Sequence, residues 1–380
     1  MGKPAKCGMT GISPPNSDQI ELRLFGPGYG ECAAIHLGEN RWIVVDSCLD
    51  IKTGNPAVLD YFKAIGVSPN EAVKLIIISH WHDDHVRGLS NIVSACQTSP
   101  ICCSSVLTKK EFLAHILDYQ RIMIKSSSSG VSEINKVLKN RSLFRKALAN
   151  RIVLNLPEER TADSCLVTTL SPSDKEYDNF LKIIGSLVPS PSKKQAKKRA
   201  PSVSPNNTAV AVWIETGEVR MLLGSDLEEK GDPLSGWSAI VQSAERPKGC
   251  ASIFKIPHHG SLTGHHNNVW SDMMIESPFA VLSPFCNAGE ILPTDKDVER
   301  ITKLAPKSYI TTRYPSPKSR IRRSAAVERT IRERVGKIRA VQPAMGWVSL
   351  RNGGKANPKI WTVDLSESGS YLYDFNAKKS

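Results

Sequence analysis

The sequence predicts an α/β fold in which two β-rich halves pack as a sandwich of sheets with helices on its outer faces. Three observations carry this prediction. Short β-rich runs separated by turn residues fill roughly the first 80 residues, and similar runs return after residue 207. Segments with apolar residues at helical spacing lie between these runs, and no repeat of fixed period interrupts them. The composition, 40% hydrophobic and 23% charged over 380 residues, allows one large domain with a buried core.

The first half begins as a meander of strands. The runs Glu21–Phe25, Cys32–Leu37 and Trp42–Val45 have strand character and are separated by glycine-containing turns. Residues 56–65 carry apolar side chains at helical spacing, which predicts a helix that ends before a glycine. The continuous apolar run 75–78 follows, and so short a run is typical of a strand buried on both faces.

The middle of the chain is interpreted as an insertion. The pattern over residues 109–150 is helical and is broken by a serine run, which predicts two helices rich in lysine and arginine. A strand at 166–170 and a helix through 180–184 follow. Residues 189–205 are rich in proline, serine and lysine, and since they cannot bury a core we expect a basic mobile surface loop.

The second half returns to β structure. A hairpin pattern spans 208–214 and 219–223 and leads directly into Asp226, and another short strand, 253–256, ends at a histidine pair. Three further elements alternate between strand and helix, at 280–282, 296–304 and 308–311.

The expected organisation is one domain with short ends. It consists of a flexible N-terminus, 1–17, a domain over 18–365 and a C-terminal tail, 366–380.

Bulk properties indicate a soluble cytoplasmic protein. No run approaches about 18 consecutive apolar residues, and no apolar stretch follows basic residues at the start, so we expect neither membrane insertion nor export. Nine cysteines without a CxxC pair favour reduced thiols. The net charge of +13 attracts polyanions, which makes nucleic acid a candidate partner, although charge alone does not separate a substrate from a non-specific surface.

The densest group of ionisable side chains lies in the segment from Ser79 to His85, directly after the apolar run 75–78. Three histidines and two aspartates within six positions are too many costly groups to be explained as packing. In an extended strand exit His80 and His82 point the same way, and a sharp turn can swing Asp84 and His85 toward a second point nearby. The spacing therefore suits two adjacent metal ions held by imidazoles and a carboxylate.

This pattern, His80-x-His82-x-Asp84-His85, resembles the signature of the metallo-β-lactamase superfamily. The resemblance extends over most of the chain, because other motifs of the superfamily follow in order at the ends of expected strands. It implies a four-layer αββα sandwich with a helical insertion, and a centre of two divalent metal ions. Asp46 matches the early aspartate that supports the ligands from behind, and Asp226 matches the carboxylate that bridges both metals.

The segment His258-His259-Gly260-Ser261 matches the last ligand motif. In this form, with Asn207-Thr208 before the hairpin, the chain is most similar to the nuclease-type domain of ComEC-like DNA-uptake proteins and to related phosphodiesterases. By analogy His259 belongs to the second metal, while His258 contacts phosphate or acts as general acid; the opposite assignment stays open. Ser261 and Thr263 are candidate donors to a bound phosphate, or plain turn formers.

One departure from the superfamily concerns the first metal. Many members supply a third histidine from the middle of the chain, but only His115 lies between His85 and Asp226, within a helical pattern. We interpret His115 as a helix residue, which leaves the first site with His80, His82, Asp226 and solvent. Zinc is the default metal, and manganese or iron also suit histidine and carboxylate ligands.

The resemblance implies a metal-dependent hydrolase. A metal-bridging hydroxide would be the nucleophile, with Asp84 orienting it and His258 protonating the leaving group. Three functions are consistent with the sequence: a phosphodiesterase or nuclease, a small-molecule hydrolase of the lactone, thioester or β-lactam type, and a non-catalytic binding subunit that keeps the fold.

The substrate prediction rests on the basic segments, above all the lysines and arginines between 313 and 339. Such a surface could follow a phosphate backbone by charge alone. A solvated helix with paired charges is the alternative for 325–335, and both interpretations stay open. A partner protein that directs the activity and the oligomeric state are left open as well.

Overall fold

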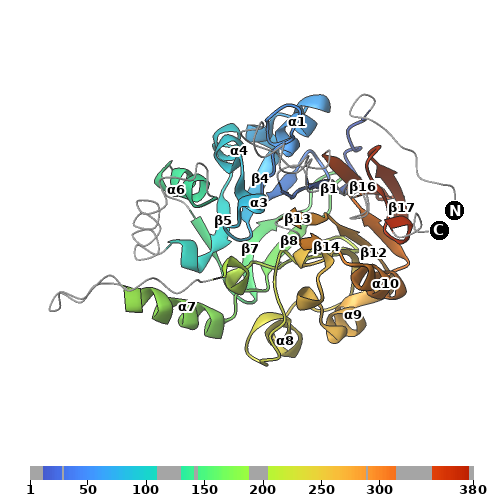
Figure 1. Cartoon of the computed structure of the whole chain (residues 1–380). Coiled ribbons are helices and arrows are strands. Elements are labelled where there is room, and N and C mark those ends of the chain that lie inside the picture. Colours follow the sequence, from blue (N-terminus) through green and yellow to red (C-terminus); the bar gives the residue numbers. More distant parts are fainter. Residues whose placement is uncertain are drawn as a thin grey trace, which may run out of the picture.

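The computed structural model describes residues 12–27, 30–108, 130–140, 144–187, 204–287, 290–313 and 345–375. Within these ranges the chain forms two eight-stranded sheets that face each other, with helices outside each sheet (Figure 1). This confirms the α/β sandwich predicted from the alternation of strands and helices.

The first sheet joins the beginning of the chain to its late strands. Its strands are β1 (Ile20–Gly26), β2 (Cys32–Leu37), β3 (Trp42–Val45), β4 (Val73–Ile78), β5 (Ile101–Ser104), β6 (Phe144–Ala147), β16 (Gly346–Gly353) and β17 (Asn357–Leu365). They lie in the order β17-β16-β1-β2-β3-β4-β5-β6. From β3 to β6 all neighbours are parallel, so their carboxyl ends meet at one edge of the sheet.

The second sheet is built from the middle and later parts of the chain. Its strands are β7 (Arg151–Leu156), β8 (Cys165–Thr169), β9 (Val212–Thr216), β10 (Val219–Leu223), β11 (Ala251–Lys255), β12 (Met274–Leu282), β15 (Lys307–Ile310) and β18 (Ser370–Tyr371). Their order is β18-β15-β12-β11-β10-β9-β8-β7, and β10, β11, β12 and β15 are parallel. A separate hairpin joins β13 (Phe285–Asn287) and β14 (Glu290–Leu292).

Helices form the outer layers. The α-helices are α1 (Ala57–Ala64), α2 (Pro69–Ala72), α3 (Asp83–Val86), α4 (Leu89–Ala95), α6 (Gly130–Asn140), α7 (Asp174–Leu187), α8 (Gly236–Gln242), α9 (Asn267–Met273) and α10 (Asp295–Leu304). Single 3-10 turns are η1 (Ser105–Thr108), η2 (Pro205–Thr208), η3 (His258–Gly260), η4 (Leu262–Gly264) and η6 (Tyr373–Phe375). Figure 1 shows α1, α4 and α6 on one side of the sandwich and α8, α9 and α10 on the other. Buried side chains of these helices pack on the outer face of the nearer sheet.

Strands β3 and β4 are apolar apart from Lys74, and their surroundings explain why. In β3, Trp42 and Val44 pack outward against α1, while Ile43 packs inward between the sheets. In β4, Ile76 faces the helices and Ile77 faces the second sheet. Both faces of each strand are buried, so alternation of apolar and polar residues is absent.

The structure differs from the sequence prediction in the inserted region. Helix α6 lies within the predicted insertion 109–150, but the helical prediction is wrong for residues 144–147, which form β6. Pairing with β5 at the edge of the first sheet overrides the helical pattern there. Residues 109–129, with the first predicted helix and His115, lie outside the described residues.

Other predictions also fall partly outside the described residues. These are the basic loop, of which 189–203 is not described, and the basic stretch, of which 314–339 is not described. The predicted tail 366–380 contributes Ser370–Tyr371 to the second sheet as β18. Strands β16 and β17 were not predicted at all. Among the helices of the described ranges, none is both long and apolar enough to span a bilayer.

Candidate metal centre

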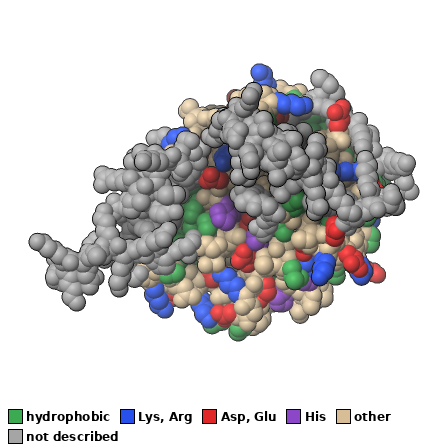
Figure 2. All heavy atoms as spheres, in the orientation of Figure 1, with side chains coloured by type: hydrophobic (Ala, Val, Ile, Leu, Met, Phe, Trp, Pro, Cys, Tyr) green, Lys and Arg blue, Asp and Glu red, His purple; other side chains and the backbone are tan. Residues whose placement is uncertain are grey.

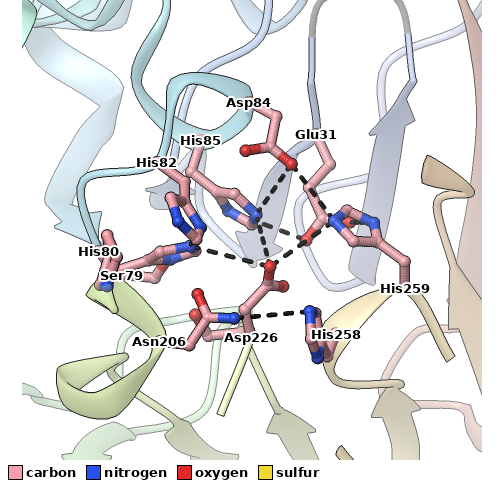
Figure 3. A network of polar contacts seen from close by, with 12 residues as sticks. Glu31, Ser79, His80, His82, Asp84, His85, Asn206, Asp226, His258 and His259 are labelled. Carbon is pink, nitrogen blue, oxygen red and sulfur yellow. Dashed lines mark hydrogen bonds and ion pairs between the residues drawn. The ribbon is translucent and has the colours of Figure 1, made fainter. Parts of the chain in front are cut away.

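Polar side chains converge at one edge of the sandwich, where strands of both sheets end. Asp46 follows β3, the segment from Ser79 to His85 follows β4, Asp226 follows β10 and His259 follows β11. Figure 3 shows the side chains of the segment from His80 to His85 close to those of Asp226 and His259. Because β3 and β4 are parallel, as are β10 and β11, residues far apart in the sequence meet at this edge.

The first cluster consists of His80, His82 and Asp226. One ligand atom from each lies within 4.8 Å of the others. The Nε2 of His80 is 3.1 Å from the Nδ1 of His82 and 3.8 Å from the Oδ2 of Asp226. His80 and Asp226 are buried, whereas His82 is half-buried.

The second cluster consists of Asp84, His85, Asp226 and His259, again within 4.8 Å. The Nε2 of His259 lies 3.3 Å from Asp84 Oδ2 and 3.6 Å from Asp226 Oδ2. The Nε2 of His85 lies 3.5 Å from Asp226 Oδ2 and 3.8 Å from Asp84 Oδ2. Asp226 therefore belongs to both clusters, in the position that a bridging carboxylate requires.

Contacts behind the clusters fix which imidazole nitrogen faces the centre. The Nδ1 of His259 donates to the carbonyl oxygen of Ser283 at 3.0 Å, because a carbonyl only accepts. The Nδ1 of His85 lies 2.8 Å from Asp46 Oδ2 in the same arrangement. In both residues Nε2 is left with a lone pair toward the centre, which is the form that binds a metal.

Asp46 holds several of these groups at once. Its carboxylate accepts hydrogen bonds from the backbone N–H and the hydroxyl of Ser79, at 2.7 and 2.6 Å, in addition to the His85 contact. Ser79 Oγ in turn lies 3.0 Å from His80 Nδ1. Asp46 also has φ +60°, a strained conformation for a residue other than glycine. The structure thus places Asp46 behind the ligand candidates rather than among them.

The donor set fits a pair of divalent metal ions. Among the described residues, His85 Nε2, His259 Nε2 and Asp226 Oδ1 are buried atoms without a hydrogen-bond partner. Leaving such an atom unpaired costs about 1–3 kcal/mol, which a metal bond would offset. Imidazole and carboxylate are the ligands of catalytic zinc sites and also accept manganese or iron.

The electrostatic environment favours the metal-binding forms of several groups. Burial, with His85 nearby, holds the pKa of His80 well below its usual range, so its imidazole is neutral. Burial alone would raise the pKa of Asp226, but His85 and His259 hold it well below its ordinary value. His85 differs: although burial opposes its charged form, Asp226 and Asp84 raise its pKa above the ordinary value, so an ion that binds there displaces a proton.

His258 stands apart from both clusters. Its Nδ1 lies 2.7 Å from Thr263 Oγ1 and 3.4 Å from Glu228 Oε1, and its Nε2 is 3.4 Å from Asn206 Nδ2. Ser261 Oγ is 3.1 Å from Thr263 Oγ1. The geometry thus groups His259, and not His258, with Asp84 and His85, and it gathers Ser261 and Thr263 around His258.

Part of the site reaches the surface. His82, Asp84 and His258 are half-buried. Figure 2 shows histidine side chains exposed in the middle of this face, with carboxylates nearby. A substrate can therefore approach the clusters from this side.

Sequence reasoning missed four polar residues of the site, namely Glu31, Asn206, Glu228 and Lys255. Lys255 and Glu31 form a buried ion pair, and Glu31 Oε2 lies 3.6 Å from His259 Nδ1. A lysine at the end of the apolar strand β11 is the one signal that could have identified this pair. Burial alone would lower the pKa of the Lys255 ammonium. The Glu31 carboxylate outweighs this effect and raises the pKa, so Lys255 stays charged.

Replacing Lys255 by methionine is expected to lower the free energy of unfolding by about 3–5 kcal/mol, because the Glu31 carboxylate stays buried without its partner. Equilibrium denaturation measures this loss. The double variant Glu31→Gln/Lys255→Met should recover most of it. Lys303→Met removes an exposed pair with Glu299 and should change nothing measurable. An equal loss in the single and double variants would contradict the ion-pair explanation.

The fold and site together define an α/β sandwich with a candidate two-metal centre at its strand ends. The family model described as the metallo-β-lactamase superfamily matches residues 25–160, which contain β2 to β7 and the segment from Ser79 to His85. The match covers a little over a third of the chain, and the two sheets with their outer helices are consistent with the αββα sandwich of that superfamily.

The similarities to individual known proteins are either short or distant. A curated protein, "Beta-lactamase-like protein 2 homolog" of Caenorhabditis elegans, is 42% identical over 45 residues, which is 11% of this chain; the match spans only 15% of that relative's length. The metallo-β-lactamase fold protein YhfI from Bacillus subtilis is 12% identical, with 77% of this chain and 95% of that chain covered and a TM-score of 0.38. Zinc-bound PqqB from Methylobacterium extorquens is 13% identical, with coverage of 59% and 58% and a TM-score of 0.29.

Proposed function

We propose that the chain is a metal-dependent hydrolase whose substrate is a phosphodiester, most specifically nucleic acid. The observation that carries the proposal is the pair of ligand clusters that share Asp226. Two divalent ions, when bound, supply Lewis acidity and lower the pKa of water at neutral pH.

A different set of residues would hold each ion. His80, His82 and Asp226 would hold one ion, and Asp84, His85 and His259 the other together with Asp226. Asp84 is half-buried, so it can accept a hydrogen bond from an attacking water while it holds its ion.

His258 is proposed as the group that contacts phosphate or gives a proton to the leaving group. It lies beside the clusters on the open side, and Thr263 holds its Nδ1. Ser261 and Thr263 would stand close to a phosphate bound there. His258 and His259 both have positive φ, near +50°, a costly conformation that is found at functional sites more often than elsewhere.

Two features of the sequence favour a nucleic-acid substrate over a small molecule. The net charge of +13 attracts polyanions. The segment His258-His259-Gly260-Ser261 resembles the ComEC-like nuclease type more than other members of the superfamily. A bound nucleic acid would be the main partner, and a protein partner that directs the activity fits the same proposal.

The test uses purified protein loaded with zinc or manganese. Single-stranded and duplex oligonucleotides should be cleaved, and the rate at low substrate should fall steeply with salt. His82→Ala should lower the rate by about a thousandfold or more, because ion binding supplies several kcal/mol of transition-state stabilisation. His265→Ala, a histidine outside both clusters, should keep the wild-type rate.

The same assay separates the alternatives. Turnover of nitrocefin or a lactone without oligonucleotide cleavage would replace the phosphodiesterase by a small-molecule hydrolase. Oligonucleotide binding without any turnover in the metal-loaded protein would indicate a binding subunit.

A further inference from the structure

Asn206 lies next to the first cluster, although no sequence pattern singles it out. It belongs to η2, just before β9, and its side chain is buried, with 4% of the residue exposed. The backbone N–H of Val210 donates to the carbonyl oxygen of Ser79 at 3.0 Å, which ties this segment to the residue before His80. Figure 3 shows the Asn206 side chain beside Asp226 and below His80.

The orientation of the Asn206 amide is determined by its partners. Its Nδ2 lies 3.1 Å from the Oε1 of Glu228 and 3.4 Å from the Nε2 of His258. A carboxylate only accepts hydrogen bonds, so the NH₂ group must face Glu228. The amide oxygen therefore faces the opposite way, toward the side of His80 in Figure 3.

The amide oxygen has no hydrogen-bond partner among the described residues, although it is buried. A buried acceptor aimed into a site and left unpaired calls for a ligand. The nearest cluster, His80, His82 and Asp226, offers three ligand atoms, which leaves room at a five-coordinate ion for one more protein ligand beside a water.

We propose that the Asn206 amide oxygen is a further ligand of the ion that His80, His82 and Asp226 hold. The proposal rests on the two-metal centre proposed above. The sequence alone predicted solvent at this coordination position of the ion, where many members of the superfamily have a histidine. The proposal places the neutral amide oxygen of Asn206 there. Glu228 then has a positioning role, because it fixes the amide with its oxygen toward the centre.

The test counts bound ions per chain and measures their affinities, independently of activity. Wild-type protein should hold two ions. Asn206→Ala should keep one with unchanged affinity and bind the other about tenfold more weakly or worse, since even supporting residues of metal ligands alter affinity about 10–100-fold. A cobalt-loaded sample should show the same loss as a change in the visible absorption of one ion only.

Three further variants separate ligation from packing. Asn206→Asp/Glu228→Gln exchanges the amide and the carboxylate, which preserves the hydrogen bond between the two side chains and presents a carboxylate oxygen to the ion. This variant should restore binding of the ion at His80, His82 and Asp226. Glu228→Gln alone lets the Asn206 amide turn, because glutamine can donate as well as accept, and should weaken the same ion, though less than Asn206→Ala does. Asn207→Ala, at the neighbouring half-buried position, should resemble wild type.

Each result of these measurements either supports or overturns Asn206 as a ligand. Two ions at wild-type affinity in Asn206→Ala would overturn it. So would a weakened ion that the exchange variant does not restore, because Asn206 would then act only by holding His258. If Asn206→Ala does not fold, the exchange variant decides alone: two ions support the proposal and one contradicts it. Wild-type protein without any ion would instead overturn the metal centre itself.

Discussion

Replacing Asp226 by alanine should remove both metal ions and abolish hydrolysis. Its carboxylate is the one group shared by the two clusters, with Oδ2 within 3.8 Å of the Nε2 atoms of His80, His85 and His259. We expect affinity for each ion to fall at least about a hundredfold and the rate at least about a thousandfold. Elemental analysis and an oligonucleotide-cleavage assay measure the two effects.

A matched control is available within the ligand segment. Asp83 belongs to neither cluster and pairs with Arg87, so Asp83→Ala should keep both ions. If Asp226→Ala lost one ion and kept the other at full affinity, the two clusters would not share a bridging carboxylate, and the two-metal mechanism would have to be abandoned.

The second large effect is expected at Asp46. Its buried carboxylate accepts from Ser79 twice and contacts His85. Asp46→Ala leaves these groups without their partner, which should cost about 3–5 kcal/mol of the free energy of unfolding. Affinity for the ion at His85 should fall about 10–100-fold. Denaturant titration and competition with a chelator measure the two losses.

Asp46→Asn distinguishes stability from metal binding. An asparagine fits the same space, and its amide oxygen still accepts from the backbone N–H of Ser79. Its NH₂ group would take the place of Oδ2, which faces both the Ser79 hydroxyl and His85 Nδ1, and would force the His85 proton onto Nε2. The variant should therefore fold yet bind its ion poorly. Asp50→Asn, four residues on, changes a turn contact with Lys52 and should affect neither quantity appreciably. Full metal affinity in Asp46→Asn would show that Asp46 does not set the His85 tautomer.

The predicted site residues can be recognised from the sequence around them, whereas the missed ones cannot. The segment from His80 to His85 is recognisable because its ligands stand close together in sequence, at the end of a run that is apolar on both faces. Asp226 and His259 are recognisable from their place after strands. Glu31, Asn206 and Glu228 belong to no group of residues with ligand spacing, and only the packing of the two sheets reveals their position.

The secondary structure shows the same contrast between elements that the local sequence predicts and elements that depend on distant partners. Helix α1 follows from helical periodicity, and strands β3 and β4 follow from short apolar runs that are buried on both faces. β6 does not, since its pairing with β5 depends on a partner distant in sequence. Strands β16 and β17 pair with β1, and the bond from Ile20 N–H to Asn352 Oδ1 joins residues 332 positions apart.

The origin of the ligands in both sheets has a consequence for the stability of the sandwich. His80 to His85 extend from the first sheet and Asp226 and His259 from the second, so each ion would act as a cross-link between two layers that are otherwise joined mainly by apolar packing. The free energy of metal binding then adds to the cohesion of the two halves. Chelation would loosen the molecule along this seam before the strands within either sheet separate.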